Sequence, residues 1–293
     1  MRKSPLQTWI IPGTLILGVA TSIFFSVSAK TVSSEPISAE AESVNEFFND
    51  VGVGSNYFVQ LTYLQKENLV HGYEDGSFQP NKPITRLEGI TLINRALKTA
   101  STPLIARPND TLNLAEAIKL IITAELEYNP ELKLPEKKWS VFKDVKRNDW
   151  FAPYVDLANR KTLLSYTTKM LIKPAQPMTS GTFADLIYRA LRTREPGHFF
   201  GRGSYYSDFF EGRGTSNGEK YHQNGYTAAH KTLPFHTKLK VTYLRNAQSV
   251  QVRVNDRGPF TPSMDLDLTR RAFTDLANPS EGIIPIEYEI ISE

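Results

Sequence analysis

An aspartate at the end of an alternating segment is the side chain in this sequence whose setting best suits acid–base chemistry. Residues 250–254 alternate valine with polar side chains, and Asp256 continues the alternation just before Gly258-Pro259. This pattern predicts a strand with one buried face, on which Asp256 shares the side of the valines and is partly desolvated. Desolvation raises the pKa of a carboxyl group towards the value that a general acid needs. The alternative, on pattern alone, is an aspartate that caps the turn or pairs with Arg257.

Three histidines in the same third of the chain raise the question of a metal. His222, His230 and His236 are eight and six residues apart, which fits neither a helical nor a strand pattern of ligands. We therefore expect no metal and no cofactor. Histidine is also the commonest acid–base residue, and the alternative for His230 is a histidine of the core or of a turn.

The elements that must position these residues are strands. Residues 239–243 alternate apolar and polar side chains, as residues 250–254 do, and residues 245–248 form a polar turn between them. Together these segments predict an antiparallel hairpin with one buried face. The period of two starts after His198, so the C-terminal third is predicted to be a β domain.

Before His198 the period is helical, and the sequence repeats. Residues 57–98 and 151–192 align at a constant separation of 94 residues, and a partial third copy lies between them. The matched pairs are Leu69 and Leu163, Pro80 and Pro174, Pro83 and Pro177, Thr85 and Thr179, Arg95 and Arg189, Ala96 and Ala190, and Leu97 and Leu191. Internal repetition at a fixed separation indicates a module present in several copies.

The second helix of each copy is predicted to start at a capping residue. Thr85 with Glu88, and Asn113 with Glu116, have the spacing of a capping box, in which each side chain satisfies a backbone N–H of the other residue. The third copy keeps the cap at Thr179 but has no reciprocal glutamate. Apolar residues then follow at helical spacing in the first copy, which predicts packed helices.

Residues 71–80, His-Gly-Tyr-Glu-Asp-Gly-Ser-Phe-Gln-Pro, and residues 84–88, Ile-Thr-Arg-Leu-Glu, resemble a surface-layer homology (SLH) repeat. This family docks exported proteins on cell-wall polymers. The resemblance covers residues 47–192 and implies a bundle of three helix pairs that binds an anionic wall glycan through Arg86 and Tyr73. On the residues alone, Arg86 is equally well a solvated residue at a helix start.

Five motifs stand in order in the C-terminal third. They are Gly-Ser-Tyr-Tyr at 203–206, Gly-Arg-Gly-Thr-Ser-Asn-Gly-Glu at 212–219, Thr-Ala-Ala-His-Lys-Thr-Leu-Pro-Phe at 227–235, Val-Asn-Asp-Arg-Gly-Pro-Phe at 254–260 and Asp-Leu-Asp-Leu-Thr at 265–269. Together they resemble the rare lipoprotein A (RlpA) family, whose fold is a double-psi β-barrel. We therefore expect a multidomain α + β protein, with an N-terminal helical SLH-like repeat bundle followed by a six-stranded double-psi β-barrel.

This resemblance implies a groove that binds peptidoglycan glycan strands and, in active members, an endolytic lytic transglycosylase, a lyase that cleaves between N-acetylmuramic acid and N-acetylglucosamine. One acid protonates the glycosidic oxygen and then, as a base, draws a proton from the muramyl C6 hydroxyl, which leaves a 1,6-anhydro end. No water or protein nucleophile takes part, unlike in the two-carboxylate hydrolases. By resemblance Asp256 is that acid and base, His230 hydrogen-bonds near the reacting sugar, and Glu219 completes the polar cluster. The alternative for Glu219 is an exposed turn residue.

Four further residues are expected at the substrate. Tyr205 and Tyr206 offer rings that stack on sugars, and the alternative for both is packing within the barrel. Arg257 and Asp267 complete the expected substrate-binding set, with Asp267 orienting Arg257 or shaping the barrel. His222 stands where active members tend to have an aspartate. This departure keeps a second function open, a non-catalytic peptidoglycan-binding or expansin-like wall-loosening module.

The N-terminus is predicted to direct the chain out of the cytoplasm. Arg2 and Lys3 precede an apolar run, residues 10–27, that ends at small residues typical of a signal-peptidase site. Residues 1–29 are thus a signal peptide or an uncleaved membrane anchor, since about 18 apolar residues is the lower limit for spanning a bilayer. Either one places the remainder of the chain in the periplasm or elsewhere in the cell envelope.

Two linkers are predicted to divide the rest of the chain. Residues 30–46 are rich in Ser, Glu and Ala, so they cannot bury enough apolar surface to order themselves. A second linker, residues 193–199, contains a Pro-Gly pair. It separates the helical repeat domain, residues 47–192, from the barrel domain, residues 200–293.

Composition narrows the expected partners. The chain has 293 residues and no cysteine, which excludes disulfides, thiolate metal sites and a cysteine-linked lipid anchor. Its formal charge is +3, and residues 199–293 carry eleven basic and eleven acidic residues, so we expect no nucleic acid. The expected partners are peptidoglycan glycan strands and an anionic secondary wall polymer.

Overall fold

The computed structural model describes residues 48–291 apart from 100–105, 137–140, 165–169 and 262. The predicted signal peptide or anchor and the first linker lie outside the described residues. All described residues belong to one compact unit, Ser43–Glu293. Among them, none forms a helix long and apolar enough to cross a membrane.

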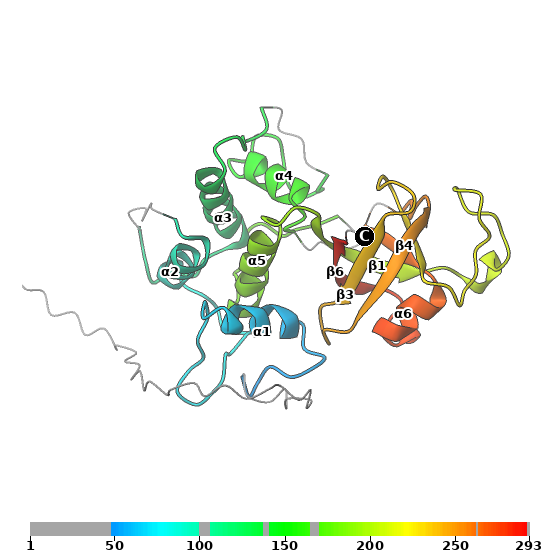
Figure 1. The fold of residues 1–293 in the computed structure, drawn as a ribbon. Helices are drawn as coiled ribbons and strands as arrows, with labels where there is room; N and C mark the ends of the chain where they lie inside the picture. Colours follow the sequence, from blue (N-terminus) through cyan, green and yellow to red (C-terminus); the bar gives the residue numbers. More distant parts are fainter. Residues whose placement is uncertain (1–47, 100–105, 137–140, 165–169, 262, 292–293) are drawn as a thin grey trace, which may run out of the picture. The chain divides into compact units, whose positions relative to one another are not determined.

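Five helices precede the barrel in the described part of the chain (Figure 1). They are α1 (Phe58–Lys66), α2 (Arg86–Leu97), α3 (Leu114–Tyr128), α4 (Ala152–Arg160) and α5 (Ser180–Arg192). The start of α4 follows that of α1 by 94 residues, and the start of α5 follows that of α2 by the same separation. The repeat seen in the sequence is therefore a repeat of structure.

The loops of the copies match in backbone detail as well. Gln79 and Lys173, which occupy equivalent positions, both have φ 56°. Asp50 accepts the backbone N–H groups of residues 78 and 79, each at 2.8 Å. Asp144 accepts those of residues 172 and 173, at 3.2 and 2.7 Å. Each carboxylate thus fixes the same left-handed turn in its own copy.

The expectation of three helix pairs is wrong for the middle copy. Among the described residues this copy contributes α3, which packs against α4 of the following copy as well as against α2. α3 obtains its apolar neighbours from both adjacent copies, because α2 and α5 pack against each other and against α3. The described bundle therefore has five helices rather than six.

The three helix starts are tied together in a ring of isolated β-bridges. Thr85 pairs with Thr111, Asn113 pairs with Pro177, and Thr179 pairs with Pro83. The predicted capping boxes at Thr85 and Asn113 are confirmed. The third copy also closes its box, because the Thr182 hydroxyl accepts the Thr179 backbone N–H at 3.0 Å where the other copies use glutamate.

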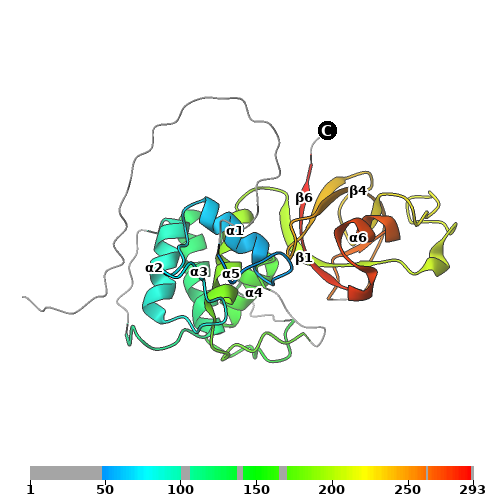
Figure 2. The same cartoon turned by 90° about the horizontal axis from the view of Figure 1, so that it is seen from below.

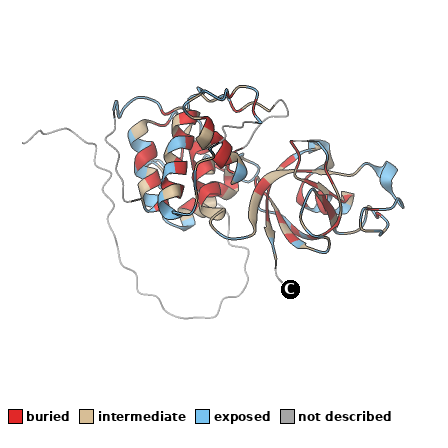
Figure 3. Cartoon of the chain, turned by 90° about the horizontal axis from the view of Figure 1, so that it is seen from above, coloured by how far each residue is buried: buried red, intermediate tan, exposed pale blue. Residues whose placement is uncertain are grey.

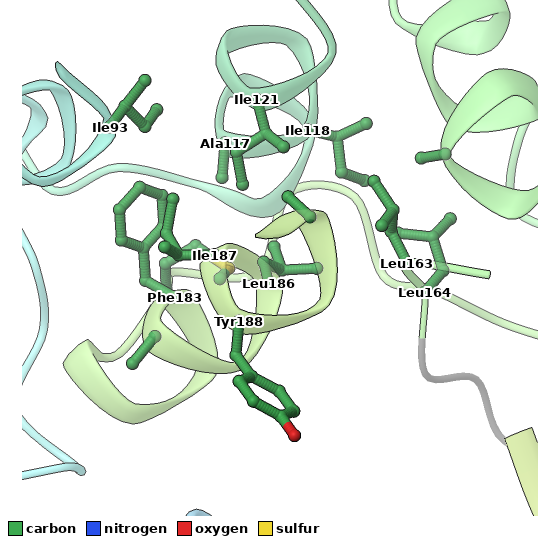
Figure 4. Packing of buried hydrophobic residues seen from close by; sticks show 14 of the residues in the cluster. Ile93, Ala117, Ile118, Ile121, Leu163, Leu164, Phe183, Leu186, Ile187 and Tyr188 are labelled. Carbon is green, nitrogen blue, oxygen red and sulfur yellow. The ribbon is translucent and has the colours of Figure 1, made fainter. Parts of the chain in front are cut away.

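The helical core is built around α5. Phe183 and Ile187 of α5 are fully buried, as is Leu61 of α1, while Ile118 and Ile121 of α3 are 2% exposed. Figure 4 shows α5 and α3 side chains in this cluster, and Figure 3 shows the buried residues on the helices and strands. The apolar faces of the amphipathic helices thus pack against a single shared core.

Six strands form a closed barrel in the order β1-β5-β2-β4-β3-β6. Their bounds are β1 (His198–Tyr205), β2 (Thr227–His230), β3 (Lys238–Tyr243), β4 (Ser249–Asp256), β5 (Leu266–Leu268) and β6 (Ile284–Ile290). β1 and β5 are parallel, as are β2 and β4, and the other pairs are antiparallel. The expected six-stranded barrel is confirmed.

The predicted hairpin is β3 and β4, with Val241 opposite Val250 and Leu239 opposite Val252. These four residues lie in the barrel core together with Phe273 of α6 (Arg270–Leu276). α6 packs on the barrel beside β1 and β4 (Figure 2), and it also contacts β5. The apolar residues of the alternating segments therefore form the interior of the barrel.

Residues 193–197 join α5 to β1, and side chains of α5 reach strand β6. Glu287, buried on β6, accepts hydrogen bonds from the Tyr188 hydroxyl and from Arg192 Nε, the latter at 2.9 Å. Phe200 of β1 packs in the same apolar cluster as the helices. β1 begins at His198, within the segment predicted to be a linker.

Replacing Phe183 by alanine tests the helical core. Phe183→Ala should lower the free energy of unfolding by about 3–5 kcal/mol, because the phenyl ring is lost and a cavity remains. Leu87→Ala on α2 is the control, since Leu87 is 48% exposed and should cost well under about 1 kcal/mol. Chemical denaturation followed by circular dichroism compares the two variants, and equal stabilities would contradict this assignment of the core.

Candidate functional site

A row of residues in register across three strands brings two aspartates together. Strand β2 runs between β4 and β5, and Ala229 is paired with Asp256 on one side and with Asp267 on the other. Ser204 on β1 is paired with Asp267 and extends the row. Residues in register on adjacent strands project from the same face. The two carboxyl groups therefore flank the small side chain of Ala229.

The prediction that Asp256 shares the face of the buried valines is wrong. The register between β2 and β4 shifts at Ala228 and Ala229, so that Val254 faces Ala228 but Asp256, rather than Asn255, faces Ala229. Val254 and Asn255 are both buried, which ends the alternation. An extra residue of this kind is a β-bulge, and it turns the following side chain to the other face.

The Asp256 carboxylate is held by four hydrogen bonds. One oxygen accepts the Ser216 backbone N–H at 2.8 Å, the Ser216 hydroxyl at 2.5 Å and the Arg257 backbone N–H at 2.8 Å. The other accepts the Tyr206 hydroxyl at 2.7 Å. Burial raises the pKa of Asp256, but the bonds from Ser216, Tyr206 and Arg257 lower it, and the net pKa lies below the ordinary value. The expected upward shift is therefore wrong, and Asp256 is a carboxylate at neutral pH.

Of the two aspartates beside Ala229, Asp267 is the one whose pKa is raised. Burial is the main cause, and the negative charge of Asp256 adds to it, while a hydrogen bond from the Ser204 hydroxyl at 3.0 Å acts in the opposite direction. The expectation that Asp267 orients Arg257 is wrong, because its partner is Ser204. Two neighbouring carboxyl groups whose pKa values are driven apart can act as an acid and a base at the same pH.

Glu219 is an anchor rather than a proton donor. Both of its oxygens accept hydrogen bonds from the Arg253 guanidinium, each at 2.8 Å, and Asn255 donates a third at 3.1 Å. These bonds, led by that from Arg253, lower the pKa of Glu219 to about 2. The Thr215 hydroxyl and backbone N–H also bond to the Glu219 carbonyl oxygen. Glu219 thus ties the turn at 212–221 to β4.

This turn brings to the site a residue that no pattern in the sequence marks. Ser216 lies within it and supplies two of the four bonds to Asp256. The residue lies in the motif at 212–219, but a serine in a turn carries no charge or periodicity to mark it. Its importance depends on the turn folding back over the end of β4.

The structure does not bring the His230 ring to the two carboxyl groups. His230 follows Ala229 in β2 and pairs with Leu266, so its side chain projects from the opposite face. Its Nδ1 accepts the backbone N–H groups of Thr232 and Leu233, at 3.1 and 2.8 Å, which places the ring proton on Nε2. Burial, followed by the charges of Lys231 and Arg257, lowers the pKa of His230 to about 4.

The two tyrosines predicted at the substrate have different positions. Tyr206 bonds to Asp256 and keeps its proton, since burial and then that bond raise its pKa. Tyr205 packs instead, with its ring centroid 4.7 Å from that of Phe273 and its hydroxyl donating to the Pro279 carbonyl oxygen at 3.2 Å. The packing interpretation therefore fits Tyr205, and the site contains Tyr206.

Arg257 and His222 lie at the edge of this arrangement. The Arg257 guanidinium lies 3.8 Å from the ring centroid of Phe235, and it also donates to the His230 carbonyl oxygen at 3.3 Å. The His222 ring is exposed and lies 3.1 Å from Glu211. Neither side chain bonds to the Asp256 carboxylate in the described structure.

The residues predicted to bind a wall polymer lie in the helical domain. Arg86 is paired with Glu116 at 2.5 Å and with Asp110 at 3.5 Å, and its side chain is 16% exposed. It thus joins the first copy to the middle copy and is not a solvated residue. Tyr73 is 40% exposed, and its hydroxyl accepts a hydrogen bond from Lys82 at 2.8 Å.

Possible metal ligands are dispersed. Within the ranges that the structure describes, no three His, Asp or Glu side chains lie close enough together to hold a metal ion. The chemistry available at the aspartate row is proton donation by one carboxyl group, proton acceptance by the other, and hydrogen bonding by Tyr206 and Ser216.

Comparison with known proteins confirms both resemblances. Residues 199–288 match the family model described as lytic transglycolase, and residues 61–88 match that of the S-layer homology domain. The C-terminal domain is thus an RlpA-like double-psi β-barrel, and the first helical copy is an SLH repeat.

Relatives with assigned names match the C-terminal region. A Synechocystis sp. protein named "Probable endolytic peptidoglycan transglycosylase RlpA" is 50% identical over 91 residues, which are 31% of this chain and 28% of that protein. A Campylobacter jejuni protein named "Endolytic peptidoglycan transglycosylase RlpA" is also 50% identical over 91 residues, 31% of this chain and 33% of its own. This chain thus spans about a third of the length of these relatives.

Among solved structures, the chain aligns with the Streptomyces papain inhibitor (SPI). It aligns with 33% of this chain and 96% of its own length, at 22% identity and with a TM-score of 0.28.

The environment of His230 leads to a measurable pH effect. The folded-state pKa of about 4 lies below the value of about 6.5 expected for an unfolded chain. The unfolded state therefore binds the extra proton first, and stability should fall as the pH drops from about 6.5 towards about 4. An NMR titration of the His230 ring should show no protonation above about pH 5.

His230→Gln provides the control, because glutamine cannot take up the proton. Its stability should depend less on pH than that of the wild-type protein across the same interval. A His230 ring that titrates near pH 6.5 in the folded protein would contradict the assigned environment.

Proposed function

We propose that this protein is an exported endolytic lytic transglycosylase, which cleaves peptidoglycan between N-acetylmuramic acid and N-acetylglucosamine and leaves 1,6-anhydromuramyl ends. The observation that carries the proposal is the pair of aspartates flanking Ala229, one with a raised pKa and the other with a lowered pKa. The match of residues 199–288 to the lytic transglycolase model and the names of the relatives support the choice of reaction.

The first step of the proposed reaction is proton donation by Asp267. Burial raises the pKa of the Asp267 carboxyl group, and the negative charge of Asp256 adds to that shift, so Asp267 is the better proton donor of the two. Asp267 gives this proton to the glycosidic oxygen, and the bond from muramyl C1 to that oxygen breaks. The oxygen leaves as the 4-hydroxyl of N-acetylglucosamine, and positive charge develops at muramyl C1. The Asp256 carboxylate stabilises that charge.

The second step closes the anhydro ring. The muramyl C6 hydroxyl oxygen attacks C1 of the same sugar, and its proton passes to Asp256. Asp267 has lost one proton and Asp256 has gained one, so a single proton transfer between the neighbouring groups restores the starting state. The two roles that resemblance gave to Asp256 are thus divided between Asp267 as acid and Asp256 as base.

The residues around the pair act as positioning residues. Tyr206 and Ser216 hold Asp256 ionised and aligned, and Glu219 with Arg253 holds the turn that carries Ser216. His230 supports the strand end through its bonds to residues 232 and 233. None of these positioning roles requires the group to exchange a proton with the substrate.

Replacing each of the two aspartates by asparagine tests the proposal. Asp267→Asn and Asp256→Asn should each lower activity by about 10²–10⁴-fold, the usual contribution of a general acid or base. The measurement is release of 1,6-anhydro-muropeptides from purified sacculi, read by mass spectrometry. Asp275→Asn, an exposed carboxylate of α6 paired with Arg271, is the matched control and should retain activity.

The pH profile separates the two roles. Activity should fall at high pH as Asp267 loses its proton and at low pH as Asp256 gains one, so the profile should be bell-shaped. Anhydro products at the wild-type rate from either amide variant would overturn the mechanism. Binding of sacculi by the wild-type protein without any anhydro product would instead support the non-catalytic wall-binding module.

The helical domain is proposed to hold the protein at the envelope by binding an anionic wall polymer. The SLH match at residues 61–88 supports this role. Arg86 forms ion pairs with Glu116 and Asp110, so we propose that it joins the copies and does not bind the polymer. Lys82 is exposed, and its Nζ lies 4.7 Å from the ring centroid of Tyr73. The two side chains offer a cation and an aromatic ring to a glycan.

Lys82→Ala in the full chain should weaken binding to wall fragments freed of peptidoglycan by about fivefold, the equivalent of about 1 kcal/mol. Lys119→Ala is the matched control, because the Lys119 ammonium group also lies over an aromatic ring, 5.6 Å from the ring centroid of Trp150. Sedimentation with the fragments measures both variants. Equal losses, or no loss in either, would contradict a specific role for Lys82.

A further inference from the structure

A row of aromatic rings runs outwards from the Asp256 carboxylate. Tyr206, which bonds to Asp256, lies with its ring centroid 4.7 Å from that of Tyr221 and 5.7 Å from that of Phe210. Phe209 continues the row, with its ring centroid 5.6 Å from that of Phe210. We call Phe209, Phe210 and Arg213 the aromatic platform. The platform is therefore joined to the reacting carboxylate by direct ring contacts.

The outer end of this row is exposed although its residues are apolar. Phe209 is 65% exposed and Phe210 is 40% exposed. Adjacent exposed phenyl rings are unusual on a soluble surface and indicate a binding site when they are grouped. The inner end, Tyr221, is buried. The row thus runs from the buried ring of Tyr221, through Tyr206 and Phe210, to the exposed ring of Phe209.

Arg213 adds an available cation to the platform. Its guanidinium carbon lies 3.4 Å from the ring centroid of Phe209 and 6.0 Å from that of Phe210. Among the described residues no carboxylate lies within ion-pair distance of Arg213. A comparable pair in the helical domain differs in this respect, because Arg194, stacked on Tyr128 at 3.8 Å, is also paired with Glu125 at 2.9 Å.

The platform is held in place by its own loop. Phe209 and Phe210 belong to a short 3-10 helix, η1 (Asp208–Phe210), whose Asp208 is paired with Arg270 of α6 at 2.9 Å. Gly212 donates its backbone N–H to the Tyr221 carbonyl oxygen at 2.9 Å. A surface fixed before binding loses less entropy when a ligand stacks on it.

We infer that Phe209, Phe210 and Arg213 form a glycan subsite next to the cleavage site, where the phenyl rings stack on a sugar ring and Arg213 binds a carboxylate of the same strand. The apolar C–H face of a pyranose suits an aromatic face, and an unpaired guanidinium suits a carboxylate. This inference rests on the proposed function for the identity of the strand. It predicts that the enzyme binds segments longer than the disaccharide it cleaves.

The test of the phenyl rings compares glycan strands of two lengths. Phe209→Ala should raise KM for long peptidoglycan strands about three- to tenfold, the equivalent of about 0.6–1.4 kcal/mol of stacking, with kcat changed by less than about twofold. For fragments too short to reach the platform, KM should stay unchanged. Tyr128→Ala, which removes a ring that is 59% exposed and also stacked by an arginine, is the matched control and should behave as the wild type.

The test of Arg213 uses the charge of the strand. Arg213→Gln should weaken binding of strands that bear free carboxylates, whereas Arg213→Lys should restore part of the affinity. Strands whose carboxylates have been converted to amides should bind the wild-type protein and Arg213→Gln equally. Equal loss on charged and amidated strands would overturn the carboxylate contact.

A binding assay keeps this inference separate from the proposed reaction. Binding of intact glycan strands is measured for the Asp267→Asn variant and for the double variant that also carries Phe209→Ala. If the wild-type protein cleaves but Phe209→Ala changes neither KM nor binding, the subsite is wrong while the reaction stands. If the wild-type protein does not cleave but Phe209→Ala still weakens binding, the subsite stands and the reaction is wrong.

Discussion

The site depends on one constraint, the register that places Ala229 between Asp256 and Asp267. Ala229 adds only a methyl group to the row between the two carboxyl groups. Burial raises the pKa of Asp267, and the negative charge of Asp256 adds to that shift. A shift of register by one residue would send either aspartate to the opposite face. The closed barrel prevents such a shift, since each of these strands is paired on both sides.

The asymmetry between the two aspartates comes from the loop that follows β1. That loop contributes Tyr206 and Ser216, whose hydrogen bonds stabilise charge on Asp256. Asp267 receives one hydrogen bond, from Ser204 within the barrel wall. The same barrel wall therefore carries one carboxyl group with a lowered pKa and one with a raised pKa. Glu219 and Arg253 maintain this difference from a distance, because they fix the turn that presents Ser216.

In the helical domain, residues at the helix starts also join neighbouring copies. Its three copies share a ring of bridges at the helix starts, and Arg86 joins the first copy to Glu116 of the middle one. A carboxylate in a capping box thus serves both its own helix and the neighbouring copy. This use of Arg86 within the fold explains why an arginine in an SLH motif can be structural, and it leaves Tyr73 and Lys82 as the exposed polar pair.

Much of the architecture follows from the sequence because it depends on local pattern. The separation of 94 residues, the capping boxes at Thr85 and Asn113 and the hairpin of β3 and β4 are all confirmed. Each is set by residues a few positions apart, through helical period, strand alternation and hydrogen bonds to nearby backbone. The motifs at 203–206 and 265–269 likewise indicated the barrel and the presence of Asp267 in it.

The face on which each site residue lies and the direction of its pKa shift were decided only by the tertiary structure. The bulge beside Ala229 reversed the face predicted for Asp256, and it arises from pairing with β2, about 27 residues earlier in the chain. The lowered pKa of Asp256 depends on hydrogen bonds from Tyr206 and Ser216, which lie 50 and 40 residues away in sequence. The raised pKa of Asp267 depends on burial within the folded barrel. A carboxyl group's pKa reflects burial, charges and hydrogen bonds in space. Local sequence specifies which residues are present, and only the closed barrel specifies which of them meet.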